Sequence, residues 1–166
     1  MSKPPTALDI ECALSRYFNA RTNIIVPNVS WGLGLHECDL LVLTPSNYAY
    51  EVEIKRSRAD ILADKKKHHD HYNEKISKLF FAIPENLWEC VDLIPGHAGI
   101  ISITEKGVGN YCCRLDRKAQ RKSDYRFSAD EKTQLARLGT MRVWTLKHRI
   151  QALLDRLEKD NEINRI

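Results

Sequence analysis

Apolar residues near the start of the chain recur at the spacing of an amphipathic helix. Ile10 and Leu14 lie one helical turn apart and share a face with further apolar residues of positions 7–20. Thr6 precedes this stretch and Asp9 follows three positions later, which is the pattern of an N-terminal capping pair. We therefore predict a helix over residues 7–20.

Short apolar runs separated by turn residues follow, and they are typical of strands. The predicted strands comprise residues 23–29, 38–44, 48–55, 78–83, 98–104 and 110–115. The other predicted helices comprise residues 57–75, 85–93 and 128–138 and a last one after Arg142, with a loop over residues 116–127. The run at 38–44 is apolar on both faces, as in sheets covered by helices on both sides. We expect one α/β domain over residues 1–166, with a central mixed sheet flanked by helices.

The composition is that of a soluble protein. Hydrophobic residues make up 43% of the chain and charged residues 29%, which is ordinary for a globular domain. No apolar run approaches the roughly 20 residues of a membrane helix, and no signal-peptide pattern opens the chain. The five cysteines are odd in number and irregularly spaced, which argues against a disulfide framework. We expect a cytoplasmic protein with reduced thiols and no membrane contact.

Positive charge is concentrated in two segments. Residues 55–67 and 114–126 each contain six Lys or Arg against two Asp, a net charge of +4, which equals the net charge of the whole chain. Two basic zones on an otherwise acidic chain suit a surface that contacts nucleic-acid phosphates, and solvated faces are the alternative. The residues predicted on this basis to bind DNA are Arg56, Arg58, Lys65, Lys66, Arg117, Lys118, Arg121, Lys122 and Tyr125.

Three ionisable residues alternate with apolar ones in the predicted strand 48–55. Side chains of a strand point to opposite faces in turn, so Glu51, Glu53 and Lys55 share one face. Such groups are costly on a strand that otherwise reads as buried, unless something compensates their charge. A divalent cation would compensate the carboxylates, and an anionic substrate would compensate the lysine.

Asp39 supplies a second carboxylate, because it begins the strand that precedes this one. A hairpin between the two strands would bring Asp39 alongside Glu53. Two carboxylates, with the backbone carbonyl of Ile54 as a further ligand, favour Mg²⁺ or Mn²⁺ over zinc. A metal-activated water next to a lysine is suited to phosphodiester hydrolysis, in which Lys55 could orient the water, aid its deprotonation or offset phosphate charge.

These residues resemble a known family. Asp39 followed by Glu53-x-Lys55 between two helices resembles the PD-(D/E)xK nuclease core, and the string from Val52 to Asp64 is similar to the MmcB-type DNA-repair endonucleases. The similarity spans roughly residues 37–103. It implies a restriction-endonuclease-like αβββαβ core, a magnesium-type metal held by Asp39 and Glu53, and Lys55 as the catalytic lysine. The proline that usually precedes the aspartate is replaced by a cysteine, at a position that ligates nothing.

The same resemblance raises three secondary candidates. Glu11 of the first helix is an accessory metal ligand by this comparison, with a solvated helix glutamate as the alternative. His68 and Tyr72 lie at i and i+4, similar to a Q-x-x-x-Y pair that contacts DNA in some related nucleases. A zinc site formed by the neighbouring histidines and Cys112 with Cys113 is disfavoured, because adjacent strand residues point to opposite faces.

We therefore predict a metal-dependent endonuclease that hydrolyses DNA, in repair, recombination or phage DNA processing. Two alternatives stay open: a nuclease-fold accessory protein that binds DNA or a protein without cutting, and a structural protein whose Glu-x-Lys string forms surface salt bridges. A homodimer stays open as well, since the sequence shows no interface signature. Trp31, Trp88 and Trp144 sit among apolar neighbours and are expected in the core.

Overall fold

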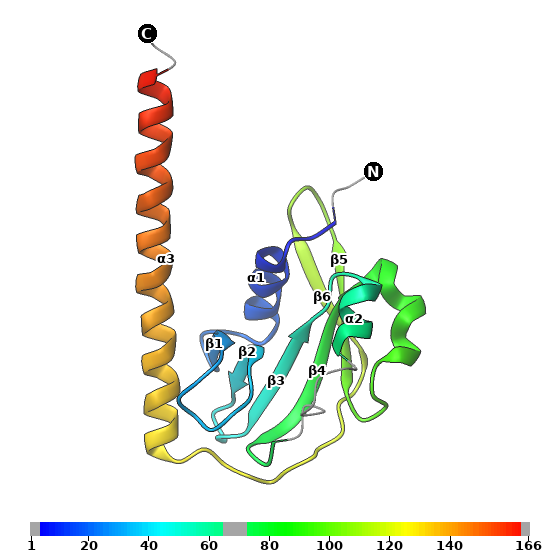
Figure 1. Ribbon diagram of the computed structural model, residues 1–166. Coiled ribbons are helices and arrows are strands. Elements are labelled where there is room, and N and C mark those ends of the chain that lie inside the picture. The colour runs from blue at the N-terminus through cyan, green and yellow to red at the C-terminus, as the bar shows by residue number, and fades with distance from the viewer. Residues whose placement is uncertain (1–3, 65–72, 164–166) are drawn as a thin grey trace.

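The computed structural model describes residues 4–64 and 73–163, and their centre is one six-stranded mixed sheet. The strands lie in the order of the sequence (Figure 1). The elements are α1 (Ala7–Tyr17), β1 (Ile24–Val29), β2 (Cys38–Leu43), β3 (Ala49–Ile54), α2 (Arg58–Asp64), β4 (Ile76–Pro84), the 3₁₀ helix η1 (Glu85–Leu93), β5 (Gly99–Glu105), β6 (Tyr111–Arg117) and α3 (Ala129–Ile163). Strands β3, β4 and β5 run parallel to one another, and the remaining neighbours pair antiparallel.

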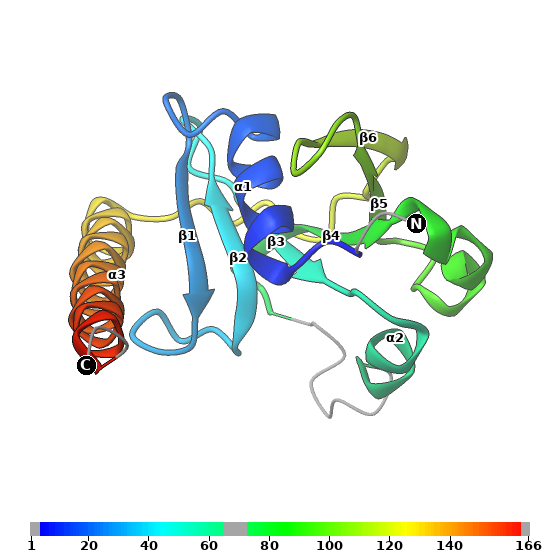
Figure 2. The ribbon, with the colours of Figure 1, turned by 90° about the horizontal axis from the view of Figure 1, so that it is seen from above.

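Helices cover both faces of the sheet, as the apolar strands predict (Figure 2). On one face, Ile10 and Leu14 of α1 pack against Val52 of β3 and its neighbours. On the other face, Ile61 of α2 packs with Phe81 of β4 and with residues of η1. The core therefore lies in two layers, and β3 runs between them.

Local sequence signals explain where α1 begins. The side chain of Thr6 accepts the amide of Asp9 at 3.2 Å, and the amide of Thr6 donates to the Asp9 carboxylate at 2.8 Å. This reciprocal pair is the capping box that the sequence predicts, and it satisfies amide groups that a helix end leaves without partners. The helix ends at Tyr17, three residues earlier than predicted.

One helix, α3, takes the place of the two helices predicted at the C-terminus. The prediction of a break between Leu138 and Arg142 is wrong, because α3 runs without interruption through Gly139. A Cβ atom at Gly139 would lie 3.3 Å from a methyl carbon of Val26 in β1. The glycine therefore lets the helix approach the sheet edge closely, and packing of Leu135 and Leu138 against β1 and β2 outweighs the low helix propensity of glycine.

Other expectations also need correction or hold only in part. Trp31, Trp88 and Trp144 are exposed rather than in the core. Strand β6 includes Asp116 and Arg117, which the sequence placed in a loop. All five cysteines are free thiols. Within the described part of the chain, no helix is long and apolar enough to cross a membrane.

Candidate active site

The buried polar face of β3 carries the Glu-x-Glu-x-Lys string. Glu51 and Glu53 are fully buried and Lys55 is 5% exposed, on the face opposite to the one that packs against α1. The ammonium of Lys55 lies 2.6 Å from a carboxylate oxygen of Glu53 and 2.6 Å from one of Asp64, the last residue of α2. The strand alternation predicted from the sequence thus produces a buried ion-pair cluster between β3 and α2.

Asp39 is tied to the same end of β3. Strands β2 and β3 form the predicted hairpin, with Leu41 opposite Glu51 and Leu40 opposite Val52. Beyond the last of these pairs, the carboxylate of Asp39 accepts the backbone amide of Ile54 at 2.8 Å. Asp39 is therefore held beside the peptide unit that joins Glu53 to Ile54, the region in which the sequence predicts a metal site.

Several acidic side chains gather in this region. Burial raises the pKa of the Cys38 thiol, and nearby carboxylates raise it further. Those carboxylates belong to Glu51, Glu53, Asp39 and Glu37. Lys55 is a buried ammonium that contacts one of them, Glu53. Buried carboxylates that crowd together are stabilised by cations, whether side chains or metal ions.

Two further basic residues adjoin Glu51, and sequence reasoning did not connect them to it. His36 Nε2 lies 2.8 Å from a carboxylate oxygen of Glu51. Lys122 is partly buried, and burial lowers its pKa, while the charge of Glu51 acts in the opposite direction. Lys122 comes from the segment predicted to bind DNA, and the structure places it beside the acidic cluster. No local sequence signal links these residues, because loops that are distant in sequence bring them together.

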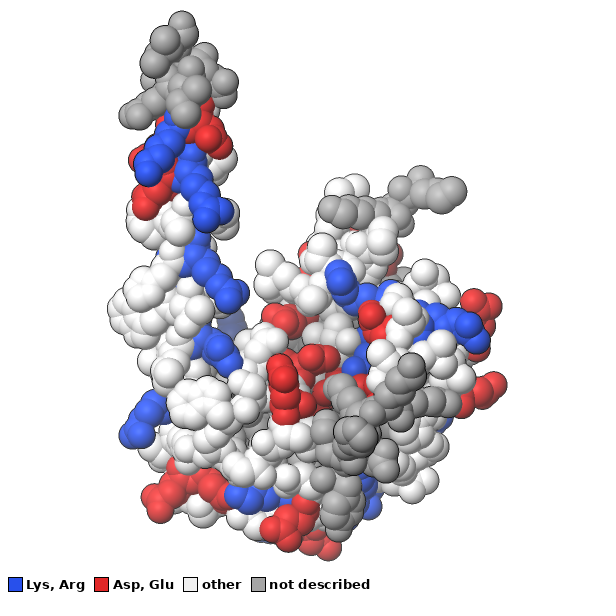
Figure 3. Space-filling view, viewed as in Figure 1, with Lys and Arg blue, Asp and Glu red and all other residues white. Residues whose placement is uncertain are grey.

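Glu11 lies close enough to Asp39 for their charges to interact. Burial raises the pKa of the Glu11 carboxyl, the charge of Asp39 raises it further, and a hydrogen bond with Asn28 lowers it. Glu11 lines a groove of about 610 Å³. The groove is lined by Ala7, Leu8, Glu11, Pro27, Asn28, Ser30, Glu37, Arg142, Thr145, Leu146 and Arg149. Acidic side chains gather in the middle of this face, across from basic side chains along α3 (Figure 3).

Several residues of the second basic zone are engaged within the protein. The guanidinium of Arg117 donates to the carbonyls of Ala98 at 2.8 Å and Pro95 at 2.7 Å. Arg121 pairs with Asp124 at 3.0 Å and stacks on the ring of Tyr48. These contacts give both arginines a structural role, and their predicted contact with DNA stays a prediction.

The remaining DNA-binding predictions fall into three groups. Tyr125 donates its hydroxyl to Glu131 at 2.9 Å, which occupies the polar end of the ring. Arg56, Arg58 and Lys118 are exposed. The other predicted contacts, Lys65, Lys66, His68 and Tyr72, lie outside the described residues.

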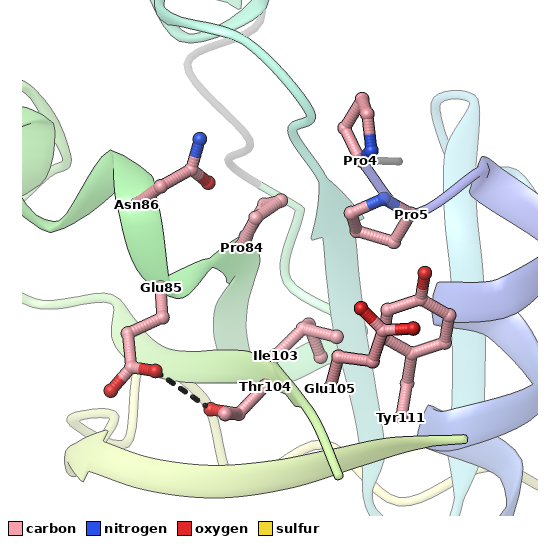
Figure 4. A pocket seen from close by; sticks show the side chains of 9 residues that line it. All are labelled: Pro4, Pro5, Pro84, Glu85, Asn86, Ile103, Thr104, Glu105 and Tyr111. Carbon is pink, nitrogen blue, oxygen red and sulfur yellow. Dashed lines mark hydrogen bonds between the residues drawn. The ribbon is translucent and has the colours of Figure 1, made fainter. Parts of the chain in front are cut away.

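A second hollow, of about 390 Å³, lies near the N-terminal end of α1 (Figure 4). Its lining residues are Pro4, Pro5, Pro84, Glu85, Asn86, Ile103, Thr104, Glu105 and Tyr111. The two charged residues among them are Glu85 and Glu105, and Glu85 accepts a hydrogen bond from the Thr104 hydroxyl at 3.2 Å. Two carboxylates repel an anionic substrate, so this hollow is a weaker candidate than the β3 cluster.

The ligand set at β3 suits a hard divalent cation. Among residues 4–64 and 73–163, no three Asp, Glu, His or Cys side chains are grouped closely enough to form a metal site by themselves. Mg²⁺ does not require such a cage, since it commonly binds one or two carboxylates and keeps several waters. Asp39, Glu53 and the carbonyl of Ile54 offer only oxygen atoms, in a region where several carboxylates gather. These residues therefore fit a magnesium-type ion.

Comparisons with known proteins identify the family and a similar fold. The family described as DNA repair protein MmcB-like matches residues 1–147. A solved structure, the SPO1766 protein of unknown function from Silicibacter pomeroyi, superposes with a TM-score of 0.60 at 22% sequence identity, covering 92% of each chain. At that identity the likeness concerns the fold alone. No curated protein matches the sequence.

Proposed function

Because the chain belongs to the MmcB-like family of DNA repair proteins, we propose that it hydrolyses DNA phosphodiester bonds with a bound divalent cation. One observation carries the proposal. Glu53 and Lys55 are buried, and their charged groups lie 2.6 Å apart. Asp39 of β2 accepts a hydrogen bond from the backbone amide of Ile54, the residue between them. Folding places these charges together at a desolvation cost that a purely structural strand would avoid.

Each residue has a defined part in the proposed reaction. Asp39, Glu53 and the carbonyl of Ile54 would hold the cation. When bound, such a cation supplies a more acidic water and offsets the charge that develops on the phosphate. Lys55 brings a positive charge to the same place, where an ammonium stabilises an anionic transition state. Asp64 and Glu53 both contact Lys55 and fix its position. Glu11 lies within electrostatic reach of Asp39 and is a candidate further ligand.

The alternative roles are less well supported. A string of surface salt bridges requires exposed side chains, whereas Glu51 and Glu53 are fully buried. A nuclease fold that binds DNA without cutting would keep the same geometry, and it differs from the proposal only in the absence of product. The experiment therefore has to measure cleavage and binding on the same samples.

The test is cleavage of labelled single-stranded, nicked, flapped and branched DNA by the purified protein, with Mg²⁺, Mn²⁺ or EDTA. We expect metal-dependent products with wild type and a loss of about 100-fold or more in Asp39→Asn, Glu53→Gln and Lys55→Met. Glu85→Gln is the matched control, since Glu85 is an exposed carboxylate whose contacts are with Thr104 and Arg114. It should cleave as wild type does.

The outcomes separate the candidate functions. Equal cleavage by wild type and by the variants at Asp39, Glu53 and Lys55 would mean that a contaminant cuts the DNA. Salt-sensitive DNA binding without product, under every metal condition, would favour the non-catalytic role. Circular dichroism spectra and thermal unfolding of each variant identify losses that come from misfolding.

A further inference from the structure

The second half of α3 presents an apolar face that the rest of the described chain does not cover. Figure 1 shows this helix projecting beyond the sheet. The large apolar side chains of α3 between positions 143 and 157 are each between 48% and 58% exposed. Single exposed apolar residues are normal on a protein surface, but a contiguous row of them marks an interaction site.

The spacing of these residues is that of a coiled coil. We define the α3 seam as Val143, Leu146, Ile150, Leu153 and Leu157, which follow each other at intervals of three and four positions. At about 100° per residue these five side chains stay within an arc of less than about 90°. The β-branched residues Val143 and Ile150 are each followed three positions later by a leucine, as in the heptads of two-stranded coiled coils. Leu154, which is 48% exposed, adjoins the seam and widens the apolar arc to about 100°, which still suits one partner helix, whereas helices that lie on membranes have a broader apolar face.

The flanks of the seam are basic. Arg142, Arg149 and Arg156 follow it on one side at intervals of seven residues, and Lys147 lies on the other side. Arg142 is engaged with the carbonyl of Asn28. Within the described part of the chain, Arg149 and Arg156 form no salt bridge. In coiled coils these flanking positions select the partner by charge.

A second copy of the chain is a poor partner by this criterion. The flanking positions of the seam contain Arg, Lys, Leu and Asn, and no carboxylate. Parallel pairing would set Arg142 against Lys147 of the other copy, and antiparallel pairing would set Arg149 against Arg156. The acidic residues of this stretch, such as Asp155 and Glu158, occupy outer positions of the repeat. Like charges across such a contact are unfavourable.

We infer that the α3 seam binds an amphipathic helix of another protein, whose apolar stripe is flanked by Glu or Asp at heptad spacing. Carboxylates at those positions would pair with Arg149, Arg156 and Lys147 while the apolar stripe covers the seam. The inference uses neither Asp39 nor the β3 residues, although Leu146 and Arg149 also line the groove that contains Glu11. Residues 148–163 also lie beyond the part of the chain that matches the family.

The experiment uses the full chain and a fluorescent designed helical peptide with Ile and Leu at heptad core positions and Glu at both flanking positions. A matched peptide carries Lys in place of Glu. We expect saturable binding of the Glu peptide by fluorescence anisotropy, weakened by salt, and binding of the Lys peptide weaker by about ten-fold or more.

Two protein variants locate the contact. Ile150→Asn with Leu153→Asn should weaken binding of the Glu peptide by about ten-fold or more, because it removes the centre of the seam. Arg149→Glu with Arg156→Glu should reverse the preference in favour of the Lys peptide. Met141→Asn is the matched control on the same helix, since Met141 is exposed but lies off the seam. Circular dichroism verifies that α3 stays helical in each variant.

Failure of the Glu peptide to bind, or equal binding of both peptides, would overturn the inference. So would a seam-dependent dimer in sedimentation equilibrium, which would make a second copy the occupant. Seam-dependent binding to vesicles of phosphatidylcholine and phosphatidylserine, without peptide binding, would assign the face to a membrane surface instead.

Discussion

The buried face of β3 and residues 114–126 are both rich in charge, yet their side chains have different surroundings. On β3, the buried Lys55 contacts two carboxylates. At the end of β6, Arg117 donates to backbone carbonyls of the turn before β5. Buried carboxylates need cationic partners, whereas a guanidinium that donates to backbone carbonyls supports the fold.

The comparison also shows why charge along a sequence is a weak guide to DNA contacts. Residues 114–126 have a net charge of +4, like residues 55–67, and both segments look equally suited to phosphate. In the second segment, Arg117 and Arg121 contact neighbouring loops, and Tyr125 contacts Glu131 at the start of α3. Substitutions in the two regions should therefore have different consequences.

The largest effect is expected for Lys55→Met. This change removes the ammonium that contacts both Glu53 and Asp64, so the unfolding free energy should fall by about 3 kcal/mol. DNA cleavage per folded molecule should fall by about 100-fold or more. Urea denaturation and single-turnover cleavage measure the two effects. Lys106→Met, in the exposed turn between β5 and β6, is the control and should leave both unchanged.

Arg117→Met should come next, and it separates the two regions most clearly. The variant loses charged hydrogen bonds to Ala98 and Pro95, and we expect a loss of about 2 kcal/mol in unfolding free energy. DNA affinity of the folded protein should stay at the wild-type value in filter-binding assays. Lys118→Met changes an exposed neighbour and should be stable. An equal loss of DNA affinity in both variants would support the prediction that Arg117 and Lys118 contact DNA.

A smaller effect should appear as a pH dependence that originates at the start of α3. Burial tends to raise the pKa of Glu131, but hydrogen bonds from Lys75, the Ser128 amide and Tyr125 outweigh it and bring the pKa to about 2. Because the folded-state pKa lies below the unfolded value of about 4.3, this carboxylate stabilises the fold above that value. The stabilisation is lost as pH falls towards 2.

Glu131→Gln tests this dependence. Chemical denaturation should be measured between about pH 6 and pH 2, a range that includes the folded and unfolded pKa values of Glu131. The unfolding free energy should decline less steeply in the variant than in wild type. Parallel curves for the two proteins would mean that Glu131 contributes nothing to the acid sensitivity. Asp130→Asn, an exposed neighbour in the same first turn of α3, is the matched control.

The smallest effect is expected for Tyr125→Phe. It removes the hydroxyl that donates to Glu131 at 2.9 Å and keeps the ring against Phe127, so the loss should be about 1 kcal/mol. Single-stranded DNA binding should not change, because Phe retains a ring that can stack. Tyr125→Ala removes that ring, and weaker DNA binding by this folded variant would revive the predicted contact with bases.

Local patterns explain which parts of the fold could be predicted. The capping pair at Thr6 and the alternation along β3 depend on residues a few positions apart, so α1, the hairpin and the shared face of Glu51, Glu53 and Lys55 could be predicted from the sequence. The presence of helices on both faces of the sheet could also be predicted, since a strand that is apolar on both faces must be buried on both.

Long-range contacts explain what could not be predicted. From the sequence, Gly139 indicates the end of a helix. The structure shows that β1 packs closely beside this glycine, where a larger residue would crowd Val26. The ion pair of Lys55 with Asp64 depends on how α2 packs under the sheet. His36 reaches Glu51 across a loop. The exposed tryptophans stand among apolar neighbours in the sequence, and hydropathy alone could not show that Trp144 lies on a helix that projects from the domain.

Binding of Mn²⁺ tests the central claim most directly, because it depends on the carboxylates of Asp39 and Glu53 and not on the choice of DNA substrate. Electron paramagnetic resonance of free Mn²⁺ during titration gives the affinity of wild type, Asp39→Asn, Glu53→Gln and the control Glu85→Gln. We expect wild type and the control to bind alike, and Asp39→Asn and Glu53→Gln to bind weaker by about ten-fold or more. Equal binding by all four proteins, or none by wild type, would contradict a metal site at Asp39 and Glu53.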